Sequence, residues 1–374
     1  MSAVKLSDCY TATKGPALIS GTQALVRLLL EQARLDREQG LNTRGLVSGY
    51  PGSPLGGLDL ELARSKRFLD EDGIVFQPGI NEELAATALW GSQHVGLYDQ
   101  SEYDGVFALW YGKGPGLDRA MDALRHANHG GVAPNGGMVI AVGDDPMGKS
   151  STLAYQSDQG FLSLGVPYFF PRSVDDIIPM GLKAFALSRH AGCVVGLKIV
   201  IDTADANAII DTGALRPDIS TPQPMPSVHI ARHDPALLRE TKLHQSRLPA
   251  VRQWQRQNNV NPIVLTPSKK TLGIIVVGKA AQETQEAFHL LGLDQPEQKG
   301  IGMMVMTMPY PIDAETMRNF AKGYDEILVI EEKRAFVEDQ LARVLVNTPH
   351  PPQLSGKTTP SGQVLLPEYG ELTV

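Results

Sequence analysis

The chain has 374 residues, of which 42% are hydrophobic and 20% are charged, and its formal net charge is −7. At about 150 residues per domain this length suggests two domains, and the composition excludes disordered, collagen-like and coiled-coil structure. An acidic chain without a basic block lacks the charge pattern of a nucleic-acid-binding protein, so we expect no nucleic-acid partner.

The opening residues, the apolar runs and the cysteines exclude further classes of protein. The opening residues MSAVKLSDCYTATKGP contain no apolar core of signal-peptide length. The other apolar runs are shorter than the roughly 20 residues that span a bilayer, so we expect a cytoplasmic protein without membrane contact. Cys9 and Cys193 are the only cysteines. They cannot supply a disulfide framework, a structural zinc site or, within this chain, an iron–sulfur cluster.

The first part of the chain alternates between helix and strand patterns. Apolar residues recur at helical spacing from about residue 20 until Gly40, and a strand at 44–50 leads into the turn Pro51-Gly52-Ser53-Pro54. The pattern continues with strands in GIVFQPG, DGVFALWYGKGPG, GGMVIAVGDD and CVVGLKIVID and helices in NEELAATALWGSQ and LDRAMDALRHANHGG. This alternation predicts a doubly wound, mostly parallel α/β sheet, and ligands of such sheets bind at the carboxyl edge of the strands.

The composition changes after residue 205. Residues 206–266 are predicted to form a Pro-rich linker with a helix in LLRETKLHQSRLPAVRQWQRQ. Residues 267–350 are predicted to form a smaller α/β domain with strands in TLGIIVVG, GMMVMTM and EILVIEE. Residues 351–374, rich in Pro, Gly, Ser and Thr, are predicted to be a flexible tail, and residues 1–205 form the first domain.

Residues 143–150, GDDPMGKS, satisfy the phosphate-loop pattern G-x-x-x-x-G-K-[ST] after a predicted strand. Taken literally, the pattern predicts nucleotide hydrolysis, with Glu331 and Glu332 helping to hold magnesium. Asp144 and Asp145 argue against it, because they would place negative charge beside the phosphates. The residues that follow also form a poor helix, so a P-loop nucleotidase is the less favoured alternative.

His126 and His129 form an H-x-x-H pattern at the end of a predicted helix. Two ligands do not make a metal site, and no third histidine or carboxylate has suitable spacing nearby. A solvated pair near the negative end of the helix dipole explains them, and we predict no metal site in this chain.

Asn81, Glu82 and Glu83 open another predicted helix. A purely structural interpretation is sufficient on these residues alone, because Asn81 can cap the helix and the carboxylates face the positive end of its dipole. A glutamate at this place, followed nine residues later by Gly91, is also typical of thiamine-diphosphate enzymes. Both interpretations remain open on this segment alone.

Longer segments carry a more specific resemblance. Four segments, in this order, resemble the pyrimidine-binding region of large indolepyruvate ferredoxin oxidoreductases: SGYPGSPLGGLDLELARSKRFL, IVFQPGINEELAATALWGSQ, YDGVFALWYGKGPGLDRAMDALRHAN and GDDPMGKSSTL. These enzymes are thiamine-diphosphate-dependent members of the 2-oxoacid:acceptor oxidoreductase family. LGIIVVGKAAQETQEAFHLLGL and ILVIEEKRAFVEDQL resemble the small domain of that family, which is like the C-terminal domain of transketolase. The likeness covers most of residues 17–345.

The resemblance implies roles for particular residues. Glu82 would be the carboxylate that hydrogen-bonds N1′ of the cofactor's aminopyrimidine, a role that requires a largely apolar pocket. Glu83 points about 100° further around the helix and is the weaker candidate. Gly114-Pro115-Gly116 resembles the loop that approaches the pyrimidine ring, where side chains would obstruct contact. Ser53 matches a hydroxyl residue that binds the substrate carboxylate in pyruvate-acting relatives, and a serine that only completes a turn is the alternative.

Other parts of the family's active site are missing. The sequence contains no Gly-Asp-Gly followed by Asn, with which the family anchors the diphosphate through Mg²⁺, and no cysteine set for iron–sulfur clusters. We therefore expect a split subunit or a truncated portion of an indolepyruvate-type 2-oxoacid ferredoxin oxidoreductase that supplies only the pyrimidine half of the cofactor site. Such a chain should be inactive alone and should act in an oligomer. We expect its partner to bind the diphosphate and Mg²⁺, to carry the clusters and to pass electrons to ferredoxin. A non-catalytic remnant of the fold is the alternative.

Overall fold

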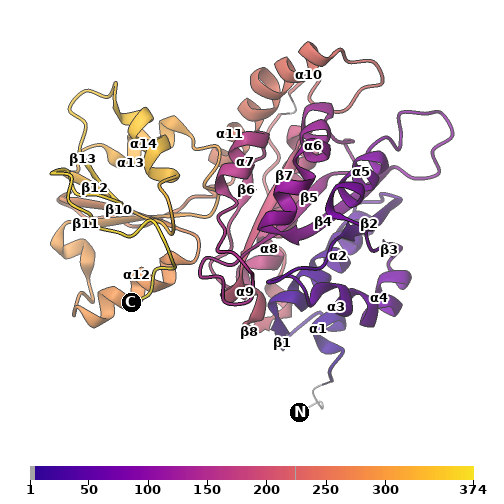
Figure 1. Ribbon diagram of the computed structural model, residues 1–374, viewed down its shortest axis with the longest axis horizontal. Coiled ribbons are helices and arrows are strands. Elements are labelled where there is room, and N and C mark those ends of the chain that lie inside the picture. The colour runs from indigo at the N-terminus through magenta and orange to yellow at the C-terminus, as the bar shows by residue number, and fades with distance from the viewer. Residues whose placement is uncertain (1–4, 224) are drawn as a thin grey trace. The chain divides into compact units, whose positions relative to one another are not determined.

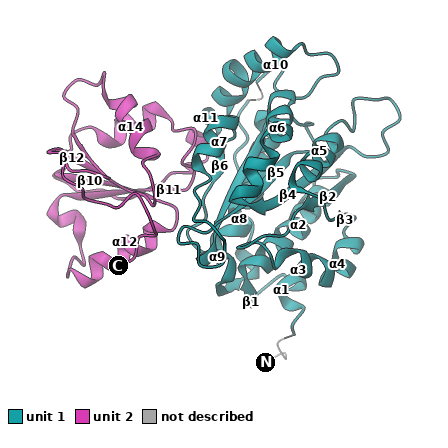
Figure 2. Cartoon of the chain, in the orientation of Figure 1, with its two compact units in different colours: residues 1–254 teal, residues 255–374 magenta. Residues whose placement is uncertain are grey.

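The computed structural model describes residues 5–223 and 225–374 (Figure 1). The chain forms two compact units, residues 1–254 and residues 255–374 (Figure 2). Within the described residues, every helix is too short or too polar to cross a membrane.

The first unit is built on a parallel sheet of six strands in the order β3-β2-β4-β5-β7-β6. Its strands are β2 (Thr43–Gly49), β3 (Ile74–Phe76), β4 (Gly105–Lys113), β5 (Met138–Asp144), β6 (Tyr168–Phe169) and β7 (Val194–Val200). The three central strands β4, β5 and β7 are buried almost throughout. Helices cover both faces of this sheet, which explains why these strands have nearly continuous apolar sequences.

Helices lie on both faces of this sheet (Figure 1). One face carries α5 (Glu82–Ser92), α6 (Gly114–Gly130) and α7 (Asp158–Leu164), and the other carries α2 (Gly21–Glu38) and α8 (Val174–Ala191). The shorter helices are α1 (Asp8–Thr11), α3 (Leu58–Arg64), α4 (Lys66–Glu71) and α9 (Ile201–Asp205). The predicted helix from about residue 20 is α2. It begins there because the side chains of Ser20 and Gln23 cap each other's backbone N–H groups.

A two-stranded antiparallel sheet joins distant parts of the first unit. β1 (Pro16–Ser20) pairs with β8 (Asn207–Asp211), which is followed by a 3₁₀ turn at Thr212–Ala214. The sequence patterns predict neither strand, because each is short and is stabilised by a partner far away in the chain.

The helix expected within residues 206–266 is present but has an irregular centre. α10 (Ala236–Lys242), a π-helical turn (Leu243–Arg247) and α11 (Leu248–Gln257) follow one another directly. Arg247 is completely buried, and its guanidinium donates hydrogen bonds of 2.6 to 3.2 Å to four backbone carbonyls. These belong to Asn128, His129 and Gly130 at the end of α6 and to Val228. Arg247 therefore caps α6 and fixes this segment to the first unit.

The second unit has a five-stranded sheet in the order β13-β12-β10-β11-β9, in which only β9 is antiparallel to its neighbour. Its strands are β9 (Ile263–Leu265), β10 (Leu272–Val277), β11 (Ile301–Met306), β12 (Glu326–Ile330) and β13 (Gln353–Ser355). Its helices are α12 (Ala280–Leu290), α13 (Ala314–Ala321), α14 (Val337–Leu345) and a 3₁₀ turn at Pro296–Lys299. β13 lies within the segment predicted as a tail, so part of that segment is built into the sheet.

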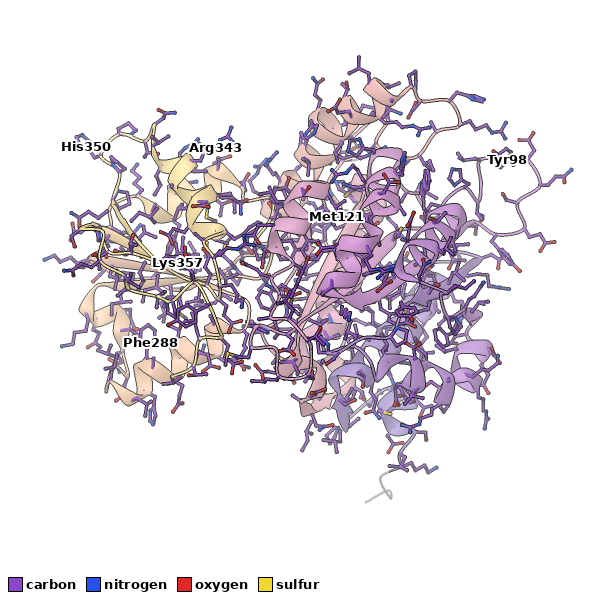
Figure 3. All side chains as sticks on the ribbon, viewed as in Figure 1. Tyr98, Met121, Phe288, Arg343, His350 and Lys357 are labelled. Atoms are coloured by element: carbon purple, nitrogen blue, oxygen red, sulfur yellow. The ribbon has the colours of Figure 1, made fainter. Side chains whose placement is uncertain are left out.

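A buried carboxyl group follows β12 in the second unit. The side chain of Glu331 accepts hydrogen bonds from three backbone N–H groups at residues 336–338, where α14 begins. Lys357, which is buried beside the second sheet (Figure 3), donates a hydrogen bond to the backbone carbonyl of Glu331. Burial raises the pKa of Glu331 to about 7, against the opposing effect of these N–H donors and of Lys357.

Candidate functional site

The residues predicted to be functional gather at the carboxyl edge of the first sheet. β2 ends at Gly49 and leads into the turn that contains Ser53. β4 ends at Lys113, directly before the Gly-Pro-Gly start of α6. β5 ends at Asp144, directly before the 145–157 loop. Because β2, β4 and β5 are parallel neighbours, all three connections leave the same edge.

Glu82 is the first residue of α5, and its side chain is buried. The side chain of Asn81 caps the helix by accepting a hydrogen bond of 2.8 Å from the backbone N–H of Leu84. Trp110 Nε1 donates a hydrogen bond of 3.0 Å to the carbonyl of Glu82, which fixes the start of the helix to β4. Glu82 is only 5% exposed, whereas Glu83 is exposed. The structure therefore places only Glu82 in an enclosed position.

Gly116 lies directly against the Glu82 side chain. A Cβ atom built on Gly116 would lie 2.9 Å from Cγ and 3.1 Å from Oε1 of Glu82. A Cβ atom on Gly114 would lie 1.9 Å from the ring of Tyr155. The two glycines are thus required by neighbouring side chains of the protein itself, and the structure brings Glu82 and the Gly-Pro-Gly segment together.

Arg119 is a charged neighbour of Glu82 that the sequence reasoning missed. Its Nε lies 3.6 Å from Glu82 Oε2, but the Arg119 side chain is 72% exposed, so solvent screens this pair. The position of Arg119 along α6 is the sequence signal that could have identified it. Arg119 lies three residues after Gly116 on α6, and residues three apart share one face of a helix.

The turn that contains Ser53 contacts the loop after β5. The hydroxyl of Ser53 is hydrogen-bonded to the hydroxyl of Ser150, and the hydroxyl of Ser151 donates a hydrogen bond of 3.0 Å to the Ser53 carbonyl. Ser53 is therefore part of a small cluster of hydroxyl groups at the sheet edge. This cluster is suited to hydrogen-bonding an acceptor such as a carboxylate.

The apparent phosphate loop does not present its N–H groups to a ligand. The carboxylate of Asp145 accepts hydrogen bonds of 2.8 to 2.9 Å from the backbone N–H groups of Lys149, Ser150 and Ser151. Burial raises the pKa of Asp145, but these N–H groups outweigh it and hold the pKa below its usual range. The next helix, α7, begins only at Asp158. The donors that phosphate would need are thus bound to the protein's own carboxylate, and the loop is not a nucleotide site.

A buried ionic network holds the far end of the same loop. Asp144 Oδ2 accepts hydrogen bonds from the backbone N–H (2.8 Å) and hydroxyl (2.9 Å) of Ser157. The Lys198 ammonium lies 2.6 Å from Asp158 and 3.5 Å from Asp144. Burial raises the pKa of Asp144, and Lys198 opposes this effect. The only signal in the sequence is a lysine within the apolar run of β7, because the carboxylates that it meets lie far away in the chain.

His126 and His129 lie near the end of α6. The His126 ring stacks on Trp90, with ring centroids 5.8 Å apart. In the described part of the chain, no group of three or more His, Cys, Asp or Glu side chains is arranged to hold a metal ion.

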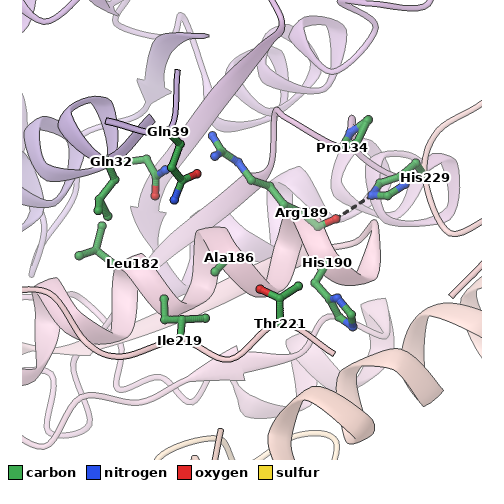
Figure 4. A pocket seen from close by; sticks show the side chains of 11 residues that line it. Gln32, Gln39, Pro134, Leu182, Ala186, Arg189, His190, Ile219, Thr221 and His229 are labelled. Atoms are coloured by element: carbon green, nitrogen blue, oxygen red, sulfur yellow. Dashed lines mark hydrogen bonds between the residues drawn. The ribbon is translucent and has the colours of Figure 1, made fainter. Parts of the chain in front are cut away.

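A cavity of about 350 Å³ lies against α2 and α8 (Figure 4). Gln39, Pro134 and Arg189 line it, and they precede the starts of β2, β5 and β7, so the cavity is at the amino edge of the sheet. Arg189 makes an ion pair of 2.6 Å with Asp36, and its carbonyl is hydrogen-bonded to His229 (Figure 4). This cavity is therefore separate from the Glu82 edge.

Comparison with known proteins confirms the predicted resemblance. The family model described as an indolepyruvate oxidoreductase domain matches residues 263–374. The indolepyruvate oxidoreductase subunit IorA of Pyrococcus horikoshii is 25% identical over 356 residues, covering 90% of this chain and 49% of the relative. The IorA subunit of Methanothermobacter marburgensis is 25% identical over 347 residues, covering 91% of this chain and 51% of the relative. The chain thus spans about half the length of the curated relatives it matches.

Two solved structures have the same fold. The 2-oxoglutarate:ferredoxin oxidoreductase from Magnetococcus marinus aligns with a TM-score of 0.65 and 15% identity, over 95% of this chain and 64% of that chain. A split gene transketolase, in an inactive beta4 tetramer, aligns with a TM-score of 0.54 and 14% identity, over 91% and 89% of the two chains. These neighbours confirm the predicted fold class, a doubly wound mostly parallel sheet with a smaller α/β domain like the C-terminal domain of transketolase.

Proposed function

We propose that this chain supplies the pyrimidine half of a thiamine diphosphate site in an indolepyruvate-type 2-oxoacid:ferredoxin oxidoreductase. The observation that carries the proposal is the buried carboxylate of Glu82, which lies against Gly116 at the carboxyl edge of the sheet. The curated relatives are subunits of an oxidoreductase, which supports this class of enzyme.

The donor set at this edge fits one end of the cofactor and its substrate. The carboxyl group of Glu82 would hydrogen-bond N1′ of the pyrimidine ring, and the Gly-Pro-Gly segment, whose Gly116 lets Glu82 pack closely against α6, would approach that ring. Ser53 would donate its hydroxyl hydrogen to the substrate carboxylate. When bound, thiamine diphosphate supplies the carbanion chemistry of 2-oxoacid decarboxylation.

The remaining parts of the site would come from a partner subunit or domain. That partner would hold the diphosphate and Mg²⁺, carry the iron–sulfur clusters and reduce ferredoxin, within a cytoplasmic oligomer. We infer that this chain has no turnover without it, because the charged end of the cofactor contributes much of the binding free energy.

Substitution of Glu82 tests the proposal directly. The chain is combined with the polypeptide that carries the Gly-Asp-Gly…Asn motif and the clustered cysteines, and oxoacid-dependent reduction of a viologen dye is measured. We expect Glu82→Gln to lower turnover by about 100-fold or more, which is the usual contribution of a positioned acid or base.

The neighbouring glutamate provides the matched control. Glu83→Gln removes the same charge from the same helical turn, but Glu83 is exposed, so this variant should retain nearly normal turnover. Normal turnover of a folded Glu82→Gln complex, or an equal loss in both variants, would contradict the assignment of Glu82.

A further inference from the structure

We propose that Lys113 binds the carboxylate of the 2-oxoacid, together with the hydroxyl groups of Ser53 and Ser150. This inference rests on the proposed function and deepens it, because it names the cation that neutralises the anionic end of the substrate. The role proposed for Lys113 is to bind the substrate, whereas the role proposed for Glu82 is to bind the cofactor.

The position of Lys113 is fixed by the end of β4. Lys113 is the last residue of that strand and directly precedes Gly114. A Cβ atom built on Gly52 would lie 2.8 Å from Cδ and 3.1 Å from Cγ of Lys113. The methylene stem of this half-buried lysine therefore runs along the backbone of the turn that carries Ser53.

The charge of Lys113 is not neutralised by the protein. Lys149 lies 3.2 Å from a carboxylate oxygen of Asp202, and Lys198 lies 2.6 Å from Asp158. By contrast, the Lys113 ammonium makes no ion pair or hydrogen bond with any residue in the ranges 5–223 and 225–374. A half-buried lysine without a counter-ion, in a chain of net charge −7, is suited to an anionic ligand.

Two hydroxyl groups complete the donor set, one on the turn after β2 and one on the loop after β5. The hydroxyls of Ser53 and Ser150 are hydrogen-bonded to each other. The Ser150 backbone is held in turn by Asp145, which accepts its N–H at 2.8 Å. A carboxylate accepts several hydrogen bonds and binds most strongly to charged donors, so one ammonium and two hydroxyls match its chemistry.

The test measures binding to the full chain by titration calorimetry, with phenylpyruvate as the acid and its methyl ester as the uncharged analogue. Lys113→Met keeps most of the stem that packs on Gly52 but removes the charge. We expect it to raise the Kd for phenylpyruvate by about tenfold or more, the usual effect of losing a charged hydrogen bond. The Kd for the ester should not change.

Two further variants control for net charge and for folding. Lys299→Met removes the same charge from an exposed position in the second unit and should leave both Kd values unchanged. Lys113→Arg keeps the cation and should retain part of the affinity for phenylpyruvate even if the methionine variant is poorly folded. Added salt should weaken phenylpyruvate binding more for the wild-type chain than for Lys113→Met.

Three results would overturn the inference: equal phenylpyruvate affinity in the wild-type chain and the Lys113 variants, an equal loss for the ester, or no saturable binding of the acid by the wild-type chain. The Glu82 experiment separates this failure from failure of the proposed function. Lys113-independent binding combined with a turnover defect in Glu82→Gln removes only the present inference. Lys113-dependent binding with normal turnover in Glu82→Gln removes only the cofactor assignment.

Discussion

Two adjacent glutamates at the start of α5 have opposite surroundings. Both occupy the first turn of the helix, where a carboxylate is favoured by the helix dipole. The side chain of Glu82 turns inward against α6, whereas Glu83 faces solvent. The sequence distinguished them only through the angle between successive residues, and the packing of α5 on α6 determines which of the two is enclosed.

At the residue scale, Gly116 should not tolerate a side chain. Gly116→Ala places a methyl carbon 2.9 Å from Cγ of Glu82, so the Glu82 side chain or α6 must shift. We expect this variant to lower the free energy of unfolding by about 1–3 kcal/mol, measured by urea denaturation.

Gly91, which lies on α5, provides the control for the Gly116 substitution on α6. A Cβ atom on Gly91 meets nothing within 4 Å, so Gly91→Ala should stabilise the chain by about 0.5–1 kcal/mol through helix propensity alone. A Gly116→Ala variant as stable as Gly91→Ala would show that Glu82 is free to move.

The residues that sequence reasoning missed are defined by contacts between distant segments. Arg119 reaches Glu82 from another helix, and Lys198 meets Asp144 and Asp158 from another strand. The spacing of Gly116 and Arg119 along α6 is the only local signal for these contacts, and no such spacing points to Lys198. By contrast, the Gly-Pro-Gly segment follows β4 directly, and Ser53 and Glu82 lie in or just after the connections that follow β2 and β3, so the parallel-sheet pattern predicts that they share one edge.

At the element scale, the alternation of strands and helices predicted the central sheet because each crossover is local in sequence. The β1–β8 pair was not predicted, since its stability depends on a partner almost at the other end of the first unit. The π-helical turn at Leu243–Arg247 was missed for a related reason. Its distortion accompanies Arg247, which binds carbonyls of α6 that the local pattern does not contain.

Arg247 should contribute strongly to the stability of the first unit. Arg247→Met leaves several buried carbonyls of α6 without their charged donor, so we expect the free energy of unfolding to fall by about 3 kcal/mol or more. Guanidinium denaturation followed by tryptophan fluorescence measures the change.

The matched control for this variant lies on the adjoining helix. Arg252 on α11 is half-buried, and its guanidinium has no hydrogen bond or ion pair in the portion of the chain described, so Arg252→Met should have little effect. Similar losses in the two variants would mean that the cap on α6 contributes nothing specific.

At the scale of the whole molecule, length alone suggests two domains, because about 150 residues make one domain, but it does not place the boundary between the units at residue 254. The local sequence pattern did not identify the strand at the edge of the second sheet. β13 comes from a segment rich in Pro, Gly, Ser and Thr, and its edge position beside β12 supplies the order that its own sequence does not indicate.

Stability of the molecule should fall as pH rises through the titration of Glu331. The pKa of Glu331 is raised from its ordinary 4.5 to about 7 by burial, so the folded state holds this proton more tightly than the unfolded state. The resulting stabilisation is full below pH 4.5 and is lost as pH rises to 7, by about 3 kcal/mol in total.

Unfolding free energies at pH 5 and pH 8 check this expectation. Glu331→Gln stays uncharged at both pH values, so its stability should change less between them than that of the wild-type chain. Parallel changes in the two proteins would assign the pH dependence to other groups.

The hydrogen bonds between Asp145 and its own loop bear on the proposed binding of a carboxylate at Ser53 and Ser150. The carboxylate of Asp145 already accepts hydrogen bonds from three backbone N–H groups, so the loop is held in its conformation without a ligand. The proposed binding of a carboxylate there would therefore cost little ordering entropy, so that few contacts would be needed for affinity.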